Sequence, residues 1–133
     1  MSVQEENKKI VTRFNKAFLE GANTDVLKEI VSDDFINQTA TGVSKDIKGL
    51  IEFVKMLNTA FPDLHITIHE QVAEGDLVAS RKTISATHLG EIFGKAPTGK
   101  KVNFSVMDFV RLKDGKYIEH WGQNNIMQVI GTL

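Results

Sequence analysis

Residues 57–72 read LNTAFPDLHITIHEQV, and the spacing of the hydrophobic side chains changes within this stretch. Up to Leu57 hydrophobic residues recur every three or four positions, as they do on one side of a helix. Pro62 cannot continue a helix, and beyond it hydrophobic and polar residues alternate, as they do along a strand with one buried face. The alternating hydrophobic residues are Leu64, Ile66, Ile68 and Val72. The stretch therefore predicts that a helical part of the chain gives way to a sheet at Pro62.

Three helices are predicted ahead of this point. Ser2 and Glu5 have the spacing of a capping box, and Gly21 provides a stop for the first helix. Asn23 or Thr24 can cap the second, and the third ends before Pro62. The expected helices cover residues 2–21, 24–31 and 44–61, and residues 35–38 between the second and the third are extended.

Four strands are predicted after Pro62. They cover residues 64–72, 77–88 and 102–112 and a fourth segment that leads toward Ile126. The last two strands are joined by KDGK at residues 113–116, a strong hairpin signal. Helices followed by a long meander indicate an α+β fold, in which a cone-shaped, curved antiparallel sheet wraps around the three N-terminal helices. With 133 residues, the chain forms one domain over residues 1–133.

Composition narrows the possible partners. The formal net charge is -1 and there is no cysteine, so neither nucleic-acid binding nor a disulfide or zinc-thiolate site is expected. The first residues carry no secretory signal, and no later segment is apolar enough for a membrane span, so we expect a cytoplasmic protein. Met107, Phe109 and Tyr117 fall at odd strand positions, where they would leave an apolar outer face, and this favours a homodimer.

The histidines do not form a metal site. His65 and His69 lie four residues apart, but on a strand their Cα atoms are separated by roughly 13 Å, too far to bind one ion. Both are expected to face solvent, opposite the apolar face of the strand. His88 lies where a strand ends at a loop with several glycines, so it is either a pocket residue or a structural residue of the rim.

Carboxylates are the other candidates for acid and base chemistry. Asp108 is the one charged residue on an otherwise apolar strand face, where burial would raise its pKa and make it a candidate base. The alternative is a structural carboxylate held by backbone donors or by a neighbour such as Arg81 or Arg111. The next strand places four side chains on one side, either toward a ligand pocket or toward solvent. These residues are Glu119, Trp121, Gln123 and Asn125.

Several motifs resemble the SnoaL-like polyketide cyclase, or ester cyclase, family of the nuclear-transport-factor-like superfamily. The motifs are DFIN (34–37), AFPDL (60–64), AEGDLVASR (73–81), THLG (87–90), GKAPTGK (94–100), MDFVR (107–111) and DGKYIEHWG (114–122). The resemblance implies a cone-shaped α+β barrel, a homodimer and an apolar cavity for a cyclic ketone-type molecule. It also implies aldol ring closure without a cofactor. Family members carry an aspartate four residues after the tryptophan, a histidine after the FIN segment and a tryptophan in the second strand. These three positions are Asn125, Gln38 and Lys82 here.

The resulting hypothesis is a cavity that binds a small apolar or aromatic carbonyl-bearing metabolite, with cofactor-independent proton transfer and no metal. The candidate catalytic residues are Asp108, His88 and Asn125. The candidate ligand-binding residues are Trp121, Asn37, Gln38, Glu119 and Gln123. Because an amide such as that of Asn125 has no proton-accepting state near neutral pH, a non-catalytic carrier of the same fold is the alternative. A protein-interaction domain is a third possibility.

Overall fold

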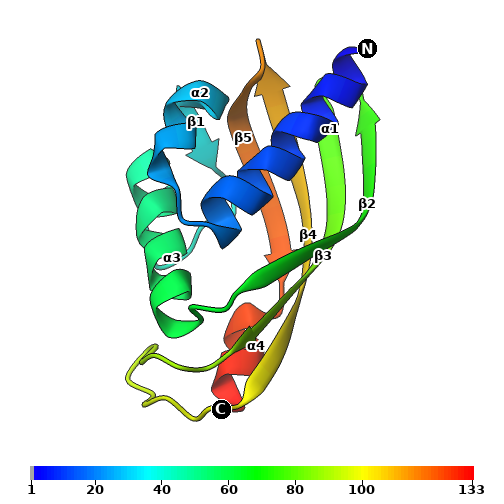
Figure 1. Ribbon diagram of the computed structural model, residues 1–133. Helices are drawn as coiled ribbons and strands as arrows, with labels where there is room; N and C mark the ends of the chain where they lie inside the picture. The colour runs from blue at the N-terminus through cyan, green and yellow to red at the C-terminus, as the bar shows by residue number, and fades with distance from the viewer. Residues whose placement is uncertain (1) are drawn as a thin grey trace.

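The computed structural model describes residues 2–133, with helices on one face of a curved, open sheet (Figure 1). Helix α1 (Val3–Arg13) begins where the Ser2 hydroxyl accepts a hydrogen bond from the Glu5 backbone N–H at 3.1 Å. The chain continues directly into the π-helical segment η1 (Phe14–Glu20) and stops at Gly21. The predicted first helix is confirmed, and α1 crosses the sheet diagonally in Figure 1.

The second predicted helix is shorter than expected, and the strand after it is longer. The helical part consists of the 3-10 turn η2 (Thr24–Val26) and α2 (Leu27–Ile30). Strand β1 (Val31–Asn37) follows and pairs in parallel with β5 (Lys116–Asn124). The sheet therefore has a fifth strand, paired in parallel, in addition to the four antiparallel strands that the sequence predicts. Burial along β1 does not alternate, so its residues lack the period-2 pattern by which strands are recognised in a sequence.

Helix α3 (Ile47–Ala60) stands beside β1 in Figure 1. The Asp46 side chain caps it by accepting the Gly49 N–H at 3.1 Å. The helix ends at Phe61, before Pro62, as the sequence predicts.

The other strands form the predicted meander of β2 (His65–Glu74), β3 (Leu77–Thr87), β4 (Lys101–Lys113) and β5. The strand order across the sheet is β1-β5-β4-β3-β2. At the β4–β5 hairpin, Asp114 and Gly115 have φ values of 52° and 76°, as a two-residue type I′ turn requires. A short helix that the sequence analysis missed, α4 (Ile126–Gly131), ends the chain. It is too short for a hydrophobic period to show in the sequence.

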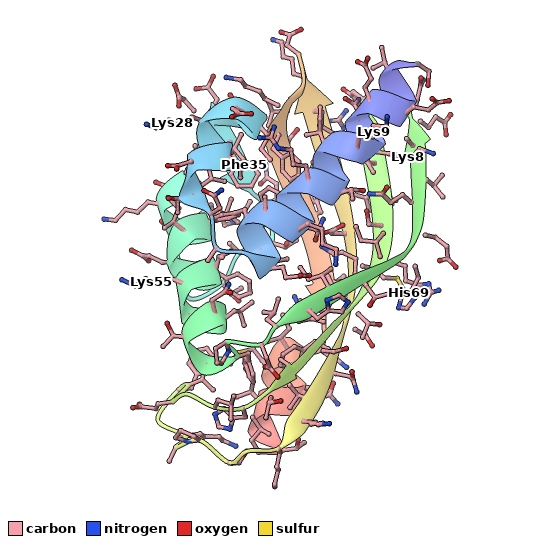
Figure 2. All side chains as sticks on the ribbon, in the orientation of Figure 1. Lys8, Lys9, Lys28, Phe35, Lys55 and His69 are labelled. Carbon is pink, nitrogen blue, oxygen red and sulfur yellow. The ribbon has the colours of Figure 1, made fainter. Side chains whose placement is uncertain are left out.

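The core lies between the helices and the concave face of the sheet. Phe35 of β1 is 3% exposed and points into this layer, whereas Lys28, Lys55 and His69 project from the surface (Figure 2). The largest fully buried side chains include Phe18, Phe61, Phe104, Leu57, Ile66, Ile84 and Tyr117. The domain thus has one continuous core, with contributions from helices and strands alike.

A bulge in β5 decides which side chains of this strand face the core. Tyr117 pairs with Leu112, and Glu119 pairs with Arg111, the residue just before Leu112 in β4. Ile118 therefore has no partner of its own and is an extra residue in β5. Opposite the inward-facing Leu112, Tyr117 also faces inward, is 1% exposed and stacks on Phe14 with the ring centroids 4.4 Å apart. The expectation that Tyr117 lies on the outer face is wrong, because the two-residue turn pairs Tyr117 with the buried Leu112. Beyond it the alternation of β5 is reversed.

Candidate functional site

Asp108 lies inside the core and forms a buried ion pair with Lys82. Even-numbered residues of β4 face the helices, and Asp108 is directly opposite Gly122 of β5 and Ser80 of β3. The Lys82 ammonium donates to Oδ2 of Asp108 at 2.8 Å and to Oδ1 of Asn15 in η1 at 2.8 Å. The Asp108 and Lys82 side chains are 6% and 3% exposed.

The electrostatics differ from the sequence-based expectation for Asp108. Burial on its own would raise the pKa of the Asp108 carboxyl, but the nearby Lys82 charge and the hydrogen bond with His120 outweigh burial and lower it. Asp108 is therefore an ionised carboxylate near neutral pH. The predicted raised pKa is wrong, and the partner is Lys82 instead of Arg81 or Arg111.

His120 joins this buried pair to the surface. Its Nε2 lies 3.3 Å from Oδ2 of Asp108, and its Nδ1 lies 2.9 Å from Oδ1 of Asn37 on β1. The parallel pairing of β1 and β5 creates this contact by placing Asn37 directly opposite His120. Gly122 makes room for the ring, since a Cβ there would lie 2.9 Å from Cε1 of His120.

A cleft of about 290 Å³ opens at His120. One end is polar, with Asn37, His120 and Asn124 in its wall, and the rest is largely apolar. The apolar lining comes from α3, the β3–β4 loop and α4, and includes Phe53, Met56, Phe93, Ile126 and Met127. An apolar hollow with a few polar groups at one end is typical of small-molecule sites.

Asn124 is fixed at the polar end by the start of α4. Its Oδ1 accepts the Ile126 backbone N–H at 3.0 Å, which leaves the two amide N–H donors of Asn124 for a ligand. Thr39 also lines this end, but its hydroxyl accepts the Gly122 N–H at 2.8 Å.

Three predicted ligand residues of β5 lie on the other face of the sheet. Glu119, Trp121 and Gln123 pair with Arg111, Phe109 and Met107, whose side chains are on the outer face. The Arg111 guanidinium lies 5.8 Å from the centroid of the Trp121 ring and 3.3 Å from the Glu119 carboxylate. Gln38 joins this outer group by donating to Glu119 at 3.0 Å. Of the two orientations that strand parity left open for Glu119, Trp121 and Gln123, the structure has the outward one.

The bulge at Ile118 is the physical reason for this difference. In a regular two-residue hairpin, Trp121 would face Asp108 across the strands, but the extra residue places Gly122 there instead. His120 and Asn124 become the inward-facing residues. His120 was not predicted, because the alternation along a strand shows which side chains share a face but not which face is buried.

His88 and Asn125 hold the backbone in place. His88 is completely buried, and its Nδ1 accepts the Thr98 backbone N–H at 3.2 Å, which ties the start of the β3–β4 loop to its end. The Asn125 Oδ1 accepts the Ser105 backbone N–H at 2.8 Å and joins the end of β5 to β4. Neither residue is part of the cleft lining.

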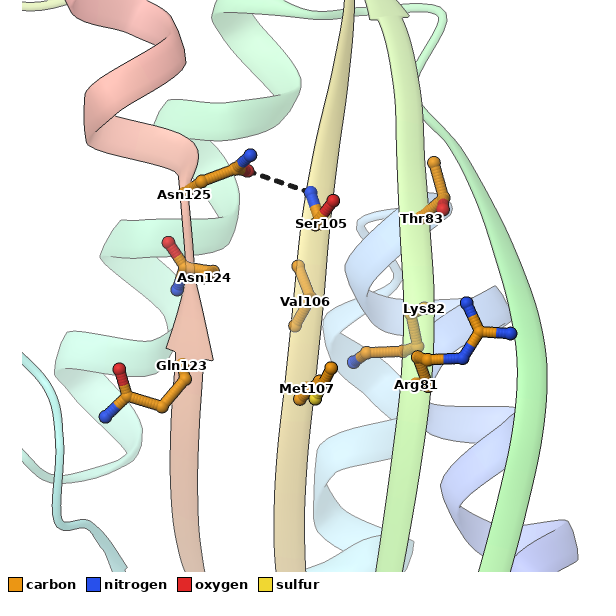
Figure 3. A pocket seen from close by; sticks show the side chains of 9 residues that line it. All are labelled: Arg81, Lys82, Thr83, Ser105, Val106, Met107, Gln123, Asn124 and Asn125. Carbon is orange, nitrogen blue, oxygen red and sulfur yellow. Dashed lines mark hydrogen bonds between the residues drawn. The ribbon is translucent and has the colours of Figure 1, made fainter.

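A second hollow, of about 360 Å³, lies near Asn125 between β3, β4 and β5 (Figure 3). Its lining includes Arg81, Met107 and Gln123 of the outer face. Glu70 binds Arg81 through two hydrogen bonds, at 2.7 and 2.9 Å. The second hollow has Lys82 of the buried pair in its lining but no histidine. The cleft at His120 is the better candidate site because its lining includes the histidine that contacts the buried Asp108 carboxylate.

The described residues show no metal cluster and no membrane-spanning helix. Within residues 2–133, no three histidine, aspartate or glutamate side chains are grouped in a way that could hold a metal ion. None of the helices in this part of the chain has the length and apolar character needed to cross a bilayer.

A family model and several solved structures of similar fold agree on one protein family. The model of the SnoaL-like polyketide cyclases matches residues 9–131. A proposed polyketide cyclase from Acidithiobacillus ferrooxidans has a TM-score of 0.86 and 26% identity, over 100% of this chain and 97% of that one. AclR, a proposed hydroxylase from Streptomyces galilaeus, has a TM-score of 0.84 and 30% identity, over 98% and 87% of the two chains.

IdmH, a proposed polyketide cyclase from Streptomyces antibioticus, has a TM-score of 0.81 and 25% identity, over 94% of this chain and 96% of that one. No curated protein matches the chain. The relatives thus share the whole domain, and their names include two kinds of reaction.

Proposed function

This chain belongs to the SnoaL-like polyketide cyclase family, and we propose that it binds a small, largely apolar carbonyl compound in the cleft and transfers a proton without a cofactor. Membership alone does not choose the reaction, because one fold hosts many chemistries and a relative is named for hydroxylation instead of cyclisation. The observation that carries the proposal is the position of His120, at the polar end of an apolar cleft and hydrogen-bonded to a buried carboxylate.

The two contacts of His120 suit proton transfer. With its Nε2–H donated to Asp108, a neutral imidazole has its lone pair on Nδ1. Because Oδ1 of Asn37 lies 2.9 Å from Nδ1, the Asn37 amide must then turn its NH₂ group toward this nitrogen. A ligand that displaces the Asn37 amide would meet this lone pair. His120 then removes a proton from the carbon next to the carbonyl. The electron pair of the C–H bond forms the C=C bond of the enolate, and the π electron pair of the carbonyl moves to its oxygen.

The imidazolium formed in this step is stabilised by Asp108 and can return its proton to the enolate or to a new alkoxide. The free amide N–H groups of Asn124 provide hydrogen bonds for the carbonyl oxygen. Asp108 and Asn37 thus remain candidate site residues, and His120 and Asn124 join them. His88 and Asn125 bind backbone groups and have no direct part in this step. The same holds for the side chains on the outer face of the sheet, which are Glu119, Trp121, Gln123 and Gln38.

A carrier without catalysis is the second candidate. Both ring nitrogens of His120 lie close to protein oxygens, Oδ2 of Asp108 and Oδ1 of Asn37, so a ligand that does not displace Asn37 would bind without reacting. Asn125 at the position of the family's aspartate also fits a carrier.

The two functions are distinguished by incubating the protein in D₂O with 2-tetralone, a bicyclic ketone with exchangeable α protons. Exchange is followed by ¹H NMR for the unmodified protein, for His120→Gln, and for the control His69→Gln at an exposed histidine. An enzyme accelerates the exchange, and His120→Gln lowers the rate at least 100-fold, in line with the contribution of a general base. A carrier shows ligand-induced shifts of cleft resonances without exchange. The absence of both would overturn a carbonyl-binding cleft.

We also propose that the outer face of the sheet pairs with a second copy of the chain. Val72, Phe109 and Met107 are 67%, 52% and 61% exposed on this face. Val72, Ala79, Phe109 and Trp121 occupy consecutive cross-strand positions and form an apolar stripe. Burial of such a stripe against its own copy is the simplest way to remove it from water.

A further inference from the structure

Lys82 is a buried lysine whose ammonium binds the same carboxylate that contacts His120. Its side chain and that of Arg81 leave β3 in opposite directions in Figure 3. The ammonium contacts Asp108 and Asn15, and Lys82 is only 3% exposed. Burying a lysine ammonium costs free energy unless it is paired, and here its charge acts on the groups that pair with it.

The same atom, Oδ2 of Asp108, binds both Lys82 and His120. A histidine beside a lone buried carboxylate holds its proton to a higher pH, because the negative charge stabilises the imidazolium. Here the positive charge of Lys82 offsets that of Asp108. The pair next to His120 therefore has no net charge.

Other charged groups near His120 have partners of their own or face solvent. On β5 and β4, Glu119 and Arg111 form an ion pair on the opposite face of the sheet. On the loop after β1, the Lys45 ammonium binds the Gln38 carbonyl at 3.1 Å in an exposed position. From β1, Asn37 brings a neutral amide to His120, with its Oδ1 2.9 Å from Nδ1. From η1, the neutral amide of Asn15 contacts Lys82.

We propose that Lys82 is a positioning residue that keeps His120 neutral, and so able to accept a proton, near neutral pH. This inference rests on the proposed role of His120 in the cleft. It assigns to Lys82 a function besides stabilising the fold. Lys82 acts on the protonation of His120 through Asp108, because Lys82 and His120 both bind Asp108.

The test is the pKa of His120, measured from imidazole chemical shifts by NMR as pH is varied, in the full chain without ligand. Lys82→Met should raise the pH at which His120 and Asp108 lose their last shared proton by at least one unit. Lys82→Arg, which keeps the charge, and Lys45→Met, which removes an exposed charge beside the cleft, should each shift it by less than about 0.3 units. A purely structural role for Lys82 predicts no shift in Lys82→Met, and that result would overturn the proposal.

Lys82→Met leaves the buried Asp108 carboxylate without a partner and can fail to fold. A second pair of variants, in which Asp108 is replaced by asparagine, avoids this. Asp108→Asn should lower the His120 pKa, and adding Lys82→Met to it should raise that pKa again by at least one unit. Equal pKa values for these two variants would overturn the proposal. Because no substrate is involved, these results are independent of the exchange assay. If exchange is unaffected by His120→Gln while Lys82→Met shifts the pKa, the catalytic proposal fails and the effect of Lys82 on His120 stands.

Discussion

The Lys82 ammonium and the Asp108 carboxylate lie 2.8 Å apart within the core, and neither side chain is more than 6% exposed. Removing one partner of such a pair leaves the other as an uncompensated buried charge. We expect Asp108→Asn to lower the free energy of unfolding by about 3 kcal/mol at pH 7, measured by urea denaturation. The double variant Lys82→Met/Asp108→Asn, which removes both charges, should recover most of this loss. Additive losses in the double variant would contradict the coupling.

The lowered pKa of Asp108 predicts how stability depends on acid. Its pKa in the folded protein is below the ordinary value of 3.8, so the unfolded chain takes up a proton first as pH falls. The stabilisation by Asp108 is therefore complete above pH 3.8 and is lost as pH falls from there through the folded-state pKa.

This dependence is measured as the free energy of unfolding between pH 6 and about pH 2.5. The unmodified protein should lose more stability over this interval than the Lys82→Met/Asp108→Asn variant. Parallel curves for the two proteins would show that Asp108 has an unshifted pKa.

Gly90 fixes the β3–β4 loop, which carries Phe93, against the end of α3. The Gly90 N–H donates to the Ala60 carbonyl at 3.0 Å, and a Cβ at Gly90 would overlap the Thr59 carbonyl oxygen. We expect Gly90→Ala to cost about 2 kcal/mol, because the backbone must move to relieve the overlap. Gly131→Ala is the matched control, since a Cβ there meets no atom of residues 2–133 within 4 Å. Thermal unfolding that shows the same midpoint for both variants would refute this close approach.

Phe109 lies at the centre of the apolar stripe on the outer face. A charge there should be tolerated by the fold, because the side chain is 52% exposed, but not by an interface between two copies. We expect Phe109→Glu to convert a dimer into a monomer in sedimentation equilibrium. Leu89→Glu, which alters an equally exposed apolar residue elsewhere, should remain dimeric. A monomeric unmodified protein would show that this face does not form a homodimer.

Local patterns were sufficient to predict most of the elements. The change of period at Pro62, the Ser2 cap, the Asp114–Gly115 turn and the alternation along β4 each depend on residues close together in the chain. Strand β1 escaped prediction because Val31 and Phe35 are buried without alternation, and its partner β5 lies more than 80 residues further along the chain. Helix α4 escaped because it has only six residues.

The sequence by itself determined that Asp108 faces the core, because strand parity places it among hydrophobic residues. It also determined that Glu119, Trp121 and Gln123 share one face. Only the tertiary structure decided that this face is the outer one and that His120 meets Asp108. One extra residue at Ile118 reverses the alternation of β5, and whether a bulge forms depends on how two strands pair, which no local pattern in either strand contains.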